Sequence, residues 1–288
     1  MAESSFEGRT CLVTGASSGV GEQTALGLAR LGARVVIVCR SRERGERSRA
    51  AIVRASGNPA VELLLADLSS QAAIRQLAKE ILAGVPAIHV LVNNAAVVNL
   101  RRATTIDGLE ATFAVNHLAY FLLTNLLRER IVASAPARIV NVASDGHKFG
   151  RLDFDDLQLE RRYGWWRAYT ASKLANVLFT VELARRLDGS RVTANCLHPG
   201  AVASRLGHNN GRFAKVATAL LKPFFLSSAQ GAETSIWAAS SPEVEGLSGR
   251  YFEKRKEGPT SAAARDETTA KRLWQESCRL TGLADDSL

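Results

Sequence analysis

Cysteine and histidine are scarce in this sequence, and both are scattered. The four cysteines lie far apart with no Cys-x-x-Cys pair among them, and the five histidines form no cluster. Metal sites built from these side chains need several ligands at short, regular spacings, so the sequence predicts no bound metal. Cys11 and Cys196 fall within strand-like segments, where a reduced cysteine packs as a small apolar side chain.

Long apolar runs are absent as well. No stretch approaches the roughly 18 residues that a membrane-spanning helix needs, because the most apolar segments, 119–127 and 213–226, are short or carry charge. Residues 1–8 do not combine a basic start with an apolar run, so no signal peptide is expected. No linker rich in Pro, Gly and Ser divides the chain. The sequence therefore predicts one cytoplasmic domain over residues 1–288, without a transmembrane segment.

Basic residues outnumber acidic ones and give the chain a formal net charge of +9. An excess of this kind raises the question of nucleic-acid binding. The arginines are interleaved with glutamates, however, as in residues 40–49, and no Lys/Arg block is followed by aromatic residues that could stack on bases. We therefore predict no nucleic-acid partner.

Apolar, β-branched runs alternate along the chain with longer segments of helical periodicity. The strand candidates are 10–13, 34–39, 61–66, 90–92, 138–142, 191–197 and 249–252. The helix candidates are 21–31, 44–55, 71–83, 108–132, 169–187 and 229–239. Near-continuous apolar strands separated by helices are typical of a parallel sheet that is covered on both faces. The predicted fold is a single α/β domain of the doubly wound Rossmann type, with about seven strands and helices on both faces.

Segment 200–227 interrupts this alternation with glycine, asparagine and arginine residues and an apolar run. Its position between a strand and a helix, at the carboxyl edge of the sheet, predicts a substrate lid from about residue 203 to 227. Two alternatives stay open. The segment is either an exposed connection that packs its apolar face on the body, or a peripheral membrane contact through residues 213–226.

The first strand candidate leads into a glycine-rich loop, Thr14-Gly-Ala-Ser-Ser-Gly-Val-Gly21, and a helical pattern follows at once. Gly15 permits a sharp turn, Gly19 lets backbone N–H groups approach a phosphate, and Gly21 allows helix and strand to pack closely. The start of the helix presents unpaired N–H groups and a partial positive charge to a pyrophosphate. The loop therefore predicts a dinucleotide-binding site. The other loop residues expected at the cofactor are Ser17, Ser18 and Val20.

The end of the second strand candidate indicates which dinucleotide is bound. A carboxylate there would accept the adenosine ribose hydroxyls of NAD and repel a 2′-phosphate. Here the strand ends in Cys39, followed by Arg40 and further arginines. A guanidinium can bind a 2′-phosphate in a planar fork, so the sequence favours NADP(H) as the cofactor. The alternative is a solvated basic start to the next helix.

Tyr169 and Lys173, four residues apart, form a second motif. This spacing places both side chains on one helix face. A free phenol, with a pKa of about 10, is a poor proton carrier at neutral pH. A neighbouring ammonium, together with a cationic nicotinamide, is expected to lower that pKa. Tyr169 is thus predicted to be the catalytic acid/base, and Lys173 to bind the nicotinamide ribose as well.

The Gly-x-x-x-Gly-x-Gly loop followed by Tyr-x-x-x-Lys resembles the short-chain dehydrogenase/reductase family, over about residues 8 to 282. The resemblance is strongest with a retinol-dehydrogenase-like branch, on segments 168–178, 197–200 and 248–252. Light-dependent protochlorophyllide reductases are a weaker second match. The resemblance implies hydride transfer between a nicotinamide and a carbonyl or alcohol. The chain lacks the N-terminal membrane anchor common in animal retinol dehydrogenases, so a retinoid substrate is not implied.

The resemblance also implies further site residues. Ser144 would bind the substrate oxygen, although its position alone is more simply explained as a strand-end cap. Asn116 would order a water beside Lys173. Asp67 and Leu68 would flank the adenine, while Asp67 could equally cap the following helix. The other implied cofactor contacts are Asn94 and Ala95 after the fourth strand, where Ala96 replaces the family's usual glycine, and Pro199, Gly200, Val202 and Ser204 after the sixth.

Large apolar side chains flank the expected site and favour a bulky apolar aldehyde or ketone as substrate. One rim would carry Phe149, Leu152, Trp165 and Trp166, and the other Leu206, Phe213, Val216, Leu220, Phe224 and Phe225. The resemblance and the apolar content of helices 108–132 and 169–187 add the expectation of a homodimer or homotetramer. The alternative function is a non-enzymatic NADP-binding sensor or scaffold on the same fold.

Overall fold

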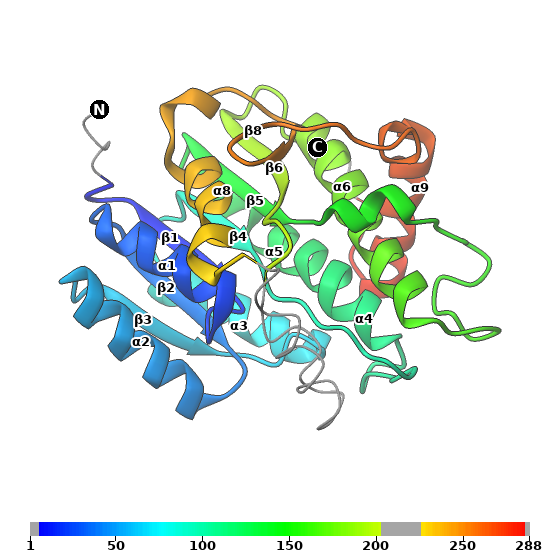
Figure 1. Cartoon of the computed structure of the whole chain (residues 1–288), viewed down its shortest axis with the longest axis horizontal. Helices are drawn as coiled ribbons and strands as arrows, with labels where there is room; N and C mark the ends of the chain where they lie inside the picture. The colour runs from blue at the N-terminus through cyan, green and yellow to red at the C-terminus, as the bar shows by residue number, and fades with distance from the viewer. Residues whose placement is uncertain (1–5, 203–225, 286–288) are drawn as a thin grey trace.

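The computed structural model describes residues 6–202 and 226–285, which form one sheet covered on both faces by helices (Figure 1). The strand order is β3-β2-β1-β4-β5-β6-β7-β8. Neighbouring strands are parallel, except for the antiparallel pair β7 and β8. The strands are β1 (Thr10–Thr14), β2 (Arg34–Cys39), β3 (Val61–Leu65), β4 (Val90–Asn93), β5 (Ala137–Val142), β6 (Val192–His198), β7 (Tyr251–Glu253) and β8 (Lys256–Glu257).

Helices cover both faces of the sheet, which confirms the predicted doubly wound fold, with β8 as an addition to the expected strands. One face carries α1 (Gly19–Arg30), α2 (Arg42–Ser56) and α8 (Ser228–Ser240). The other carries α3 (Gln71–Gly84), α5 (Ala119–Ala133) and α6 (Trp165–Arg186), with α9 (Glu267–Thr281) packed on α6. The short elements are α4 (Ala111–Phe113), the π-helical turn η1 (Ala114–Leu118), and the 3₁₀ turns η2 (Asp145–Phe149), η5 (Pro242–Val244) and η6 (Ala263–Arg265).

Successive side chains along each strand point to opposite faces of the sheet, and both sets are apolar, so the sheet has an apolar core on each face. Cys11 on β1 lies beside Val35 on β2 and Val90 on β4. All three are buried on the face of α1 and α8, and the residue that follows each of them is buried on the opposite face. Strands that are apolar on both faces need helices on both, which explains the near-continuous apolar runs in the sequence.

The helix α9 is not predicted from the sequence pattern, although its ends carry ordinary capping signals. Asp266 accepts a backbone N–H as its N-cap, and Gly282 closes it with a φ of 64°. From α9, Trp274 packs edge-on against Phe121 of α5, with ring centroids 4.9 Å apart, and stacks on Phe179 of α6 at 5.9 Å. The helix therefore completes the apolar core on this face of the sheet.

The apolar content of α5 and α6, from which an oligomer is expected, is largely used within the chain. Their large apolar side chains are buried against the sheet, α3 and α9. Within the described part of the chain, the exposed large apolar side chains of these two helices are Trp165 and Trp166, at the start of α6. The homodimer or homotetramer stays a prediction.

Two local expectations are corrected by the structure. α6 begins at Trp165 instead of Tyr169, because the extended loop ends at Gly164 and no side-chain cap marks the helix start in the sequence. The N-cap of α3 is Ser70. The alternative role expected for Asp67, as the cap of this helix, is therefore wrong. The Asp67 carboxylate instead accepts the N–H of the residue two positions later, which forms a local turn before the helix.

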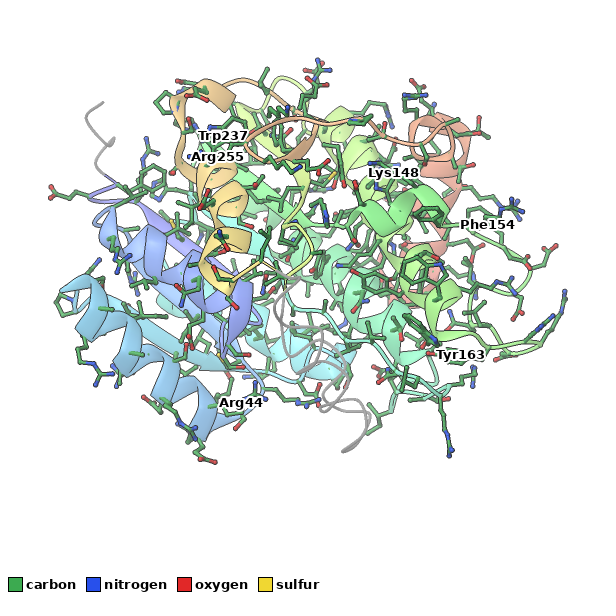
Figure 2. The ribbon with its side chains drawn as sticks, viewed as in Figure 1. Arg44, Lys148, Phe154, Tyr163, Trp237 and Arg255 are labelled. Carbon is green, nitrogen blue, oxygen red and sulfur yellow. The ribbon has the colours of Figure 1, made fainter. Side chains whose placement is uncertain are left out.

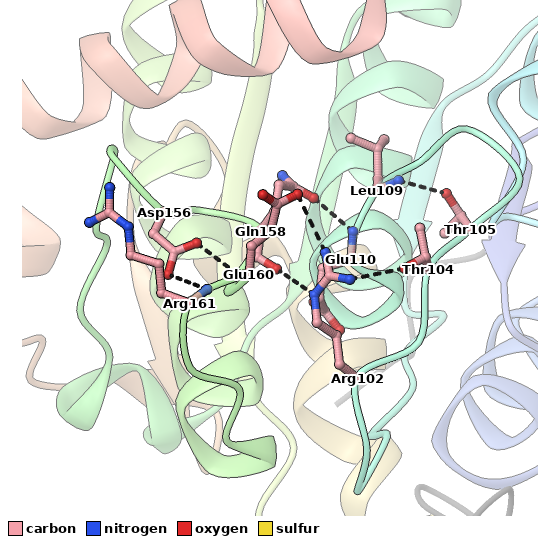
Figure 3. A network of polar contacts seen from close by, with 9 residues as sticks. All are labelled: Arg102, Thr104, Thr105, Leu109, Glu110, Asp156, Gln158, Glu160 and Arg161. Atoms are coloured by element: carbon pink, nitrogen blue, oxygen red, sulfur yellow. Dashed lines mark hydrogen bonds and ion pairs between the residues drawn. The ribbon is translucent and has the colours of Figure 1, made fainter.

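A buried carboxylate fixes the start of the helical segment that carries Asn116. Glu110 is fully buried, and its two oxygens accept backbone N–H groups of α4, which it caps. Its own N–H donates to the Gln158 side chain, and Arg102 donates to the Gln158 carbonyl (Figure 3). The loop before α4 is thus bound to the loop that leads into α6 and Tyr169, so the two helices keep a fixed relation.

Of the lid predicted at 203–227, only residues 226 and 227 are among the described residues. Of the membrane contact predicted at 213–226, only residue 226 is.

No helix within residues 6–202 and 226–285 combines the length and apolarity that a bilayer span requires. In the same part of the chain, no three His, Cys, Asp or Glu side chains are grouped so that they could hold a metal ion. The four cysteines are buried free thiols. The cytoplasmic location and the single-domain boundaries stay predictions.

Candidate active site

The carboxyl edge of the sheet opens into a crevice of about 1030 Å³, where β2 and β3 lie to one side of β1 and β4 to β8 lie to the other. Ligands of open α/β sheets bind at such a reversal of strand order. The predicted site residues that line it are Gly15, Ser17, Ser18, Gly19, Val20, Gly21, Arg40, Asp67, Leu68, Asn94, Ala95, Ser144, Tyr169, Lys173, Pro199, Gly200 and Val202. Lining residues that were not predicted include Arg44, Val97, Val115, Ala143 and His198. Ser204 and the rim expected at 206–225 lie outside the described residues.

The glycine loop is held against the end of β4. Gly15 and Gly19 have φ values of 68° and 67°, a region that favours glycine. The Asn94 side chain donates to the Thr14 carbonyl at 2.9 Å, and its backbone N–H donates to the Thr14 hydroxyl at 2.9 Å. A Cβ on Gly21 would lie 2.3 Å from the Asn94 Nδ2. The close approach that Gly21 permits is therefore between the start of α1 and the Asn94 side-chain amide.

α1 begins within this loop, and its N-terminal residues line the crevice. Ser18 is the N-cap but makes no side-chain hydrogen bond to the backbone of α1. The first N–H groups of a helix have no partner within the helix and carry a partial positive charge. Together with the neighbouring Ser17 and Ser18 hydroxyls, they form a site suited to a phosphate or pyrophosphate.

Two arginines stand at the adenosine end predicted for the crevice. Arg40 lies before α2 and is exposed, whereas Arg44 lies in the first turn of α2 and is half-buried (Figure 2). The Arg44 Nη2 donates to the Ser18 hydroxyl at 3.3 Å, and its buried Nε has no hydrogen-bond partner among the described residues. A signal for Arg44 exists in the sequence, because Ser41 as N-cap places it in the first turn of α2.

The Tyr169 ring meets the loop after β5 at Gly146. The Ser144 hydroxyl accepts the Gly146 N–H at 3.1 Å, as a strand-end cap would, and still lines the crevice. A Cβ on Gly146 would lie 3.2 Å from a Tyr169 ring carbon and 3.4 Å from the Ser144 Oγ. Burial raises the pKa of Tyr169, and a hydrogen bond with Ser144 acts in the opposite direction. The two hydroxyls are therefore close neighbours at the wall of the crevice.

Lys173 lies one helical turn beyond Tyr169 and is 2% exposed. Its Nζ donates to the Val142 carbonyl at 2.8 Å and lies 5.9 Å from the centroid of the Tyr169 ring. Burial lowers the pKa of Lys173 to about 7. The lowering of the Tyr169 pKa expected from the ammonium together with a bound cationic nicotinamide stays a prediction, since in the protein without cofactor burial raises that pKa. Loss of hydration dominates both groups, and it disfavours the phenolate and the ammonium alike.

Asn116 does not line the crevice but lies behind it in the π-helical turn η1. Its Oδ1 accepts the Val97 N–H at 2.8 Å, and its Nδ2 donates to the Val97 carbonyl at 3.0 Å and the Ser172 hydroxyl at 3.1 Å. Its backbone carbonyl accepts from the Asn176 side chain at 2.8 Å. Asn116 thereby ties the loop after β4 to α6, which accounts for an asparagine inside a helical segment. The water-ordering role stays a prediction.

A polar cluster that the sequence does not reveal supports the Ser144 loop from behind. The His147 Nδ1 lies 2.8 Å from the Ser144 carbonyl oxygen. Asp145 accepts the Tyr251 hydroxyl at 2.8 Å and pairs with Lys148 at 2.7 Å. Burial acts to raise the pKa of Asp145, but these two partners outweigh it and hold the pKa below its usual value. Tyr251 comes from β7, 106 positions away, so no local pattern could identify the pair.

Exposed aromatic side chains flank the crevice beside Tyr169. Trp166 lines the crevice, with its ring centroid 6.1 Å from that of Tyr169. Trp165 and Phe149 adjoin Trp166 at centroid distances of 5.6 and 6.2 Å. Phe149 is 70% exposed, and the two tryptophans are nearly half exposed. Leu152, expected on the same rim, packs against the apolar core instead.

Comparisons with known proteins agree with this geometry. The model of the short chain dehydrogenase family matches residues 9–214. The chain is 46% identical over 279 residues to retinol dehydrogenase 11 of Homo sapiens, covering 97% of this chain and 87% of that one. It is 45% identical over 276 residues to retinol dehydrogenase 12 of Mus musculus, covering 96% and 87%.

Solved structures extend the likeness to the fold. An uncharacterised protein from Mycobacterium paratuberculosis has a TM-score of 0.81 at 34% identity, covering 99% of this chain and 97% of that one. The Pseudomonas aeruginosa RhlG/NADP active-site complex has a TM-score of 0.70 at 27% identity, covering 88% and 96%. The chain belongs to the short chain dehydrogenase family. Within that family it is similar to the retinol dehydrogenases, which confirms the predicted branch.

Family membership makes the protein an oxidoreductase that uses a nicotinamide cofactor, and the crevice residues fit such a group. The N-terminus of α1 and the hydroxyls of Ser17 and Ser18 are donors for a pyrophosphate. The buried Nε of Arg44 is an unused donor at the opposite end from Tyr169 and Lys173. An orphaned cationic donor is the feature that an anionic ligand would satisfy.

Replacing Gly21 with alanine should weaken binding of the nicotinamide cofactor. The added Cβ would collide with the Asn94 amide and shift the loop, and overpacking of this kind costs about 1–3 kcal/mol, or roughly 5- to 150-fold in Kd. Gly84→Ala is the matched control, because a Cβ there has no neighbour within 4 Å. Calorimetric titration of both variants with the cofactor measures the effect. Equal affinity of Gly21→Ala and wild type would show that the contact with Asn94 does not shape the binding loop.

Proposed function

We propose that this protein interconverts a carbonyl compound and its alcohol by hydride transfer with NADP(H), and that Tyr169 is the catalytic acid/base. One observation carries the proposal. The phenol of Tyr169, the hydroxyl of Ser144 and the ammonium of Lys173 all line the crevice that begins at the glycine loop. A proton donor, an oxygen-binding hydroxyl and a cation beside a dinucleotide loop are the groups that carbonyl reduction needs.

Each side chain has a distinct task in the proposed reaction. When bound, the nicotinamide supplies or accepts the hydride. In the reductive direction, Tyr169 donates its proton to the substrate oxygen as negative charge develops there. Ser144 donates a hydrogen bond to the same oxygen. Lys173, with a water ordered by Asn116, replaces the proton on Tyr169. Oxidation of the alcohol uses the same groups in reverse.

The buried setting of the pair matches these tasks. A raised pKa keeps Tyr169 protonated, as a proton donor must be. With a pKa of about 7, Lys173 is distributed between its charged and neutral forms at neutral pH. Groups that transfer protons work best when their pKa lies near the working pH.

Removing the phenolic hydroxyl of Tyr169 should abolish turnover and spare cofactor binding. Tyr169→Phe keeps the ring but deletes the transferable proton, so kcat should fall by about 10²–10⁴-fold or more. Tyr163→Phe is the control, because the Tyr163 hydroxyl donates to the Asn99 carbonyl and the residue does not line the crevice. Turnover of a carbonyl panel and the Kd for NADPH are measured in parallel.

Near-normal turnover by Tyr169→Phe would contradict this mechanism. A wild-type protein that binds NADPH but reduces no member of the panel, and oxidises none of the corresponding alcohols, would support the non-enzymatic sensor or scaffold instead.

The preference for NADP(H) rests on Arg40 and Arg44. Neither the end of β2 nor the first turn of α2 offers a carboxylate that lines the crevice, whereas both guanidinium groups do. A 2′-phosphate could pair with the free donors of Arg44, and Arg40 could neutralise it from the exposed side. The RhlG structure, described as an NADP complex, supports the same choice of cofactor.

Arg44→Gln should therefore reduce the preference for NADPH over NADH. Loss of one charge-assisted hydrogen bond costs about 1.5–3 kcal/mol, or roughly 10- to 150-fold in the Kd for NADPH. The Kd for NADH should change little, and Arg40→Gln should have the smaller effect. Arg47→Gln, on the same helix but paired with Glu43 away from the crevice, is the control. A wild-type protein that prefers NADH at equal concentration would refute the assignment.

The substrate is proposed to be bulky and apolar. Trp166 extends the crevice beside Tyr169, and Phe149 and Trp165 continue the apolar surface outward. Aromatic walls with few fixed charges favour a hydrocarbon chain next to the reacting carbonyl. The names of the retinol dehydrogenases to which the chain is similar are consistent with such a substrate.

Catalytic efficiency should rise with the length of an aldehyde series. Burial of each CH₂ contributes about 0.8 kcal/mol, so kcat/KM should increase up to about fourfold per methylene until the wall is covered. Trp166→Ala should flatten this dependence, whereas Leu82→Ala, at an exposed site on α3, should not. A wild-type series that is flat or falls with added methylenes, or a clear preference for small polar carbonyls, would refute the proposal.

A further inference from the structure

The hydroxyl of Tyr120 is buried near the proton-transfer groups but has no task in the reaction above. Tyr120 lies in the first turn of α5 and is 1% exposed. Its hydroxyl has no hydrogen-bond partner among the described residues. Buried polar groups are almost always paired, and an unpaired one destabilises the fold, so a hydroxyl at this position needs an explanation.

The position of Tyr120 on its helix places it between the sheet and α6. Asn116 and Thr124, four residues before and after it, share its helix face. Asn116 donates to Ser172 on α6, and Thr124 accepts from Asn93 at the end of β4. Tyr120 lies between these two contacts, so its side chain enters the interior where β4, β5 and α6 meet.

Lys173 occupies the same interior. Its Nζ lies 6.0 Å from the centroid of the Tyr120 ring and 5.9 Å from that of Tyr169, so the ammonium is equally near two phenol rings. From β5 it meets the Val142 carbonyl, to which it donates one of its three N–H bonds. The titratable groups that face it are Tyr169 from its own helix and Tyr120 from α5. No carboxylate pairs with it within residues 6–202 and 226–285.

We propose that Tyr120 is a positioning residue for Lys173, whose charged ammonium donates a hydrogen bond to the Tyr120 hydroxyl through one water. The ring of Tyr120 adds an aromatic surface 6.0 Å from the ammonium. The interaction belongs to the protein without substrate. Its consequence for catalysis rests on the proposed function.

This arrangement opposes the effect of burial on Lys173. Loss of hydration draws the pKa of Lys173 down to about 7, and an oxygen acceptor next to the ammonium favours the charged form. Removing that acceptor should let the pKa fall further. The Tyr120 hydroxyl itself stays protonated, since burial raises its pKa well above the usual value and the electrostatic effect of Tyr169 adds to this.

Tyr120→Phe tests the proposal directly, because it deletes the hydroxyl and keeps the ring. The pKa of Lys173 is measured by NMR titration of lysine side chains in the protein without cofactor, the resonance being assigned by its loss in Lys173→Met. We expect the pKa to fall by about half a unit to one unit in Tyr120→Phe, the effect of one hydrogen bond. Tyr163→Phe removes a phenol hydroxyl elsewhere and should leave the pKa unchanged.

Folding of the variant is checked by thermal unfolding. Tyr120→Phe keeps the buried ring and removes one hydrogen bond, worth about 0.5–1.5 kcal/mol, so the variant is expected to fold with a midpoint close to that of wild type. An unchanged pKa of Lys173 in folded Tyr120→Phe would overturn the proposal. A shift of equal size in Tyr163→Phe would overturn it too, because the effect would then not come from contact with Lys173.

The pH profile of turnover supplies a second readout. A lower pKa means that the ammonium is lost at lower pH, so the basic limb of kcat should move to lower pH by the same amount, with KM near wild type. If the pKa shifts but Tyr169→Phe stays active, the proposed function fails and the role of Tyr120 toward Lys173 stands. If Tyr169→Phe is inactive and the pKa does not shift, the role of Tyr120 alone fails.

Discussion

The hydroxyl and carbonyl of Thr14 accept hydrogen bonds from the backbone and side chain of Asn94, and these bonds hold the loops after β1 and β4 together. β1 and β4 are the neighbouring strands at which the strand order reverses. Without the hydrogen bonds between Thr14 and Asn94, the loops that follow these two strands could separate. The same loop continues to Val97, which is bonded through both backbone groups to Asn116. One continuous set of hydrogen bonds therefore connects the dinucleotide-binding loop to the helices of the proton-transfer groups.

A row of buried amides and hydroxyls continues this connection beneath α5 and α6. Asn93 donates to Thr124 and Asn141, Asn141 donates to Thr180, and Thr180 donates to the Asn176 carbonyl. All five residues are fully buried. In a low dielectric such groups tolerate few other arrangements, because each broken bond leaves an unpaired polar atom. This row of hydrogen bonds thereby supports α6, the helix that carries Tyr169 and Lys173.

The features that the sequence predicts are those with a local cause. Burial on both faces produces continuous apolar strands, and the spacing of Tyr169 and Lys173 on a helix follows from helical geometry. The contact of Arg44 with Ser18 and the pairing of Asp145 with Tyr251 join separate segments, so no window of sequence contains either contact. The direction of the Tyr169 pKa was also inaccessible. Sequence reveals a neighbouring charge, but the burial that raises this pKa is a property of the whole fold.

The late position of α9 in the chain has a consequence for biosynthesis. Trp274 covers the rings of Phe121 and Phe179, which emerge from the ribosome much earlier. The half of the sheet that carries the glycine loop can pack as soon as its own helices are made, since domains begin to fold during synthesis. The half that holds Tyr169 stays open on one side until α9 arrives. In the nascent chain those aromatic rings therefore stay uncovered until the last helix has been made.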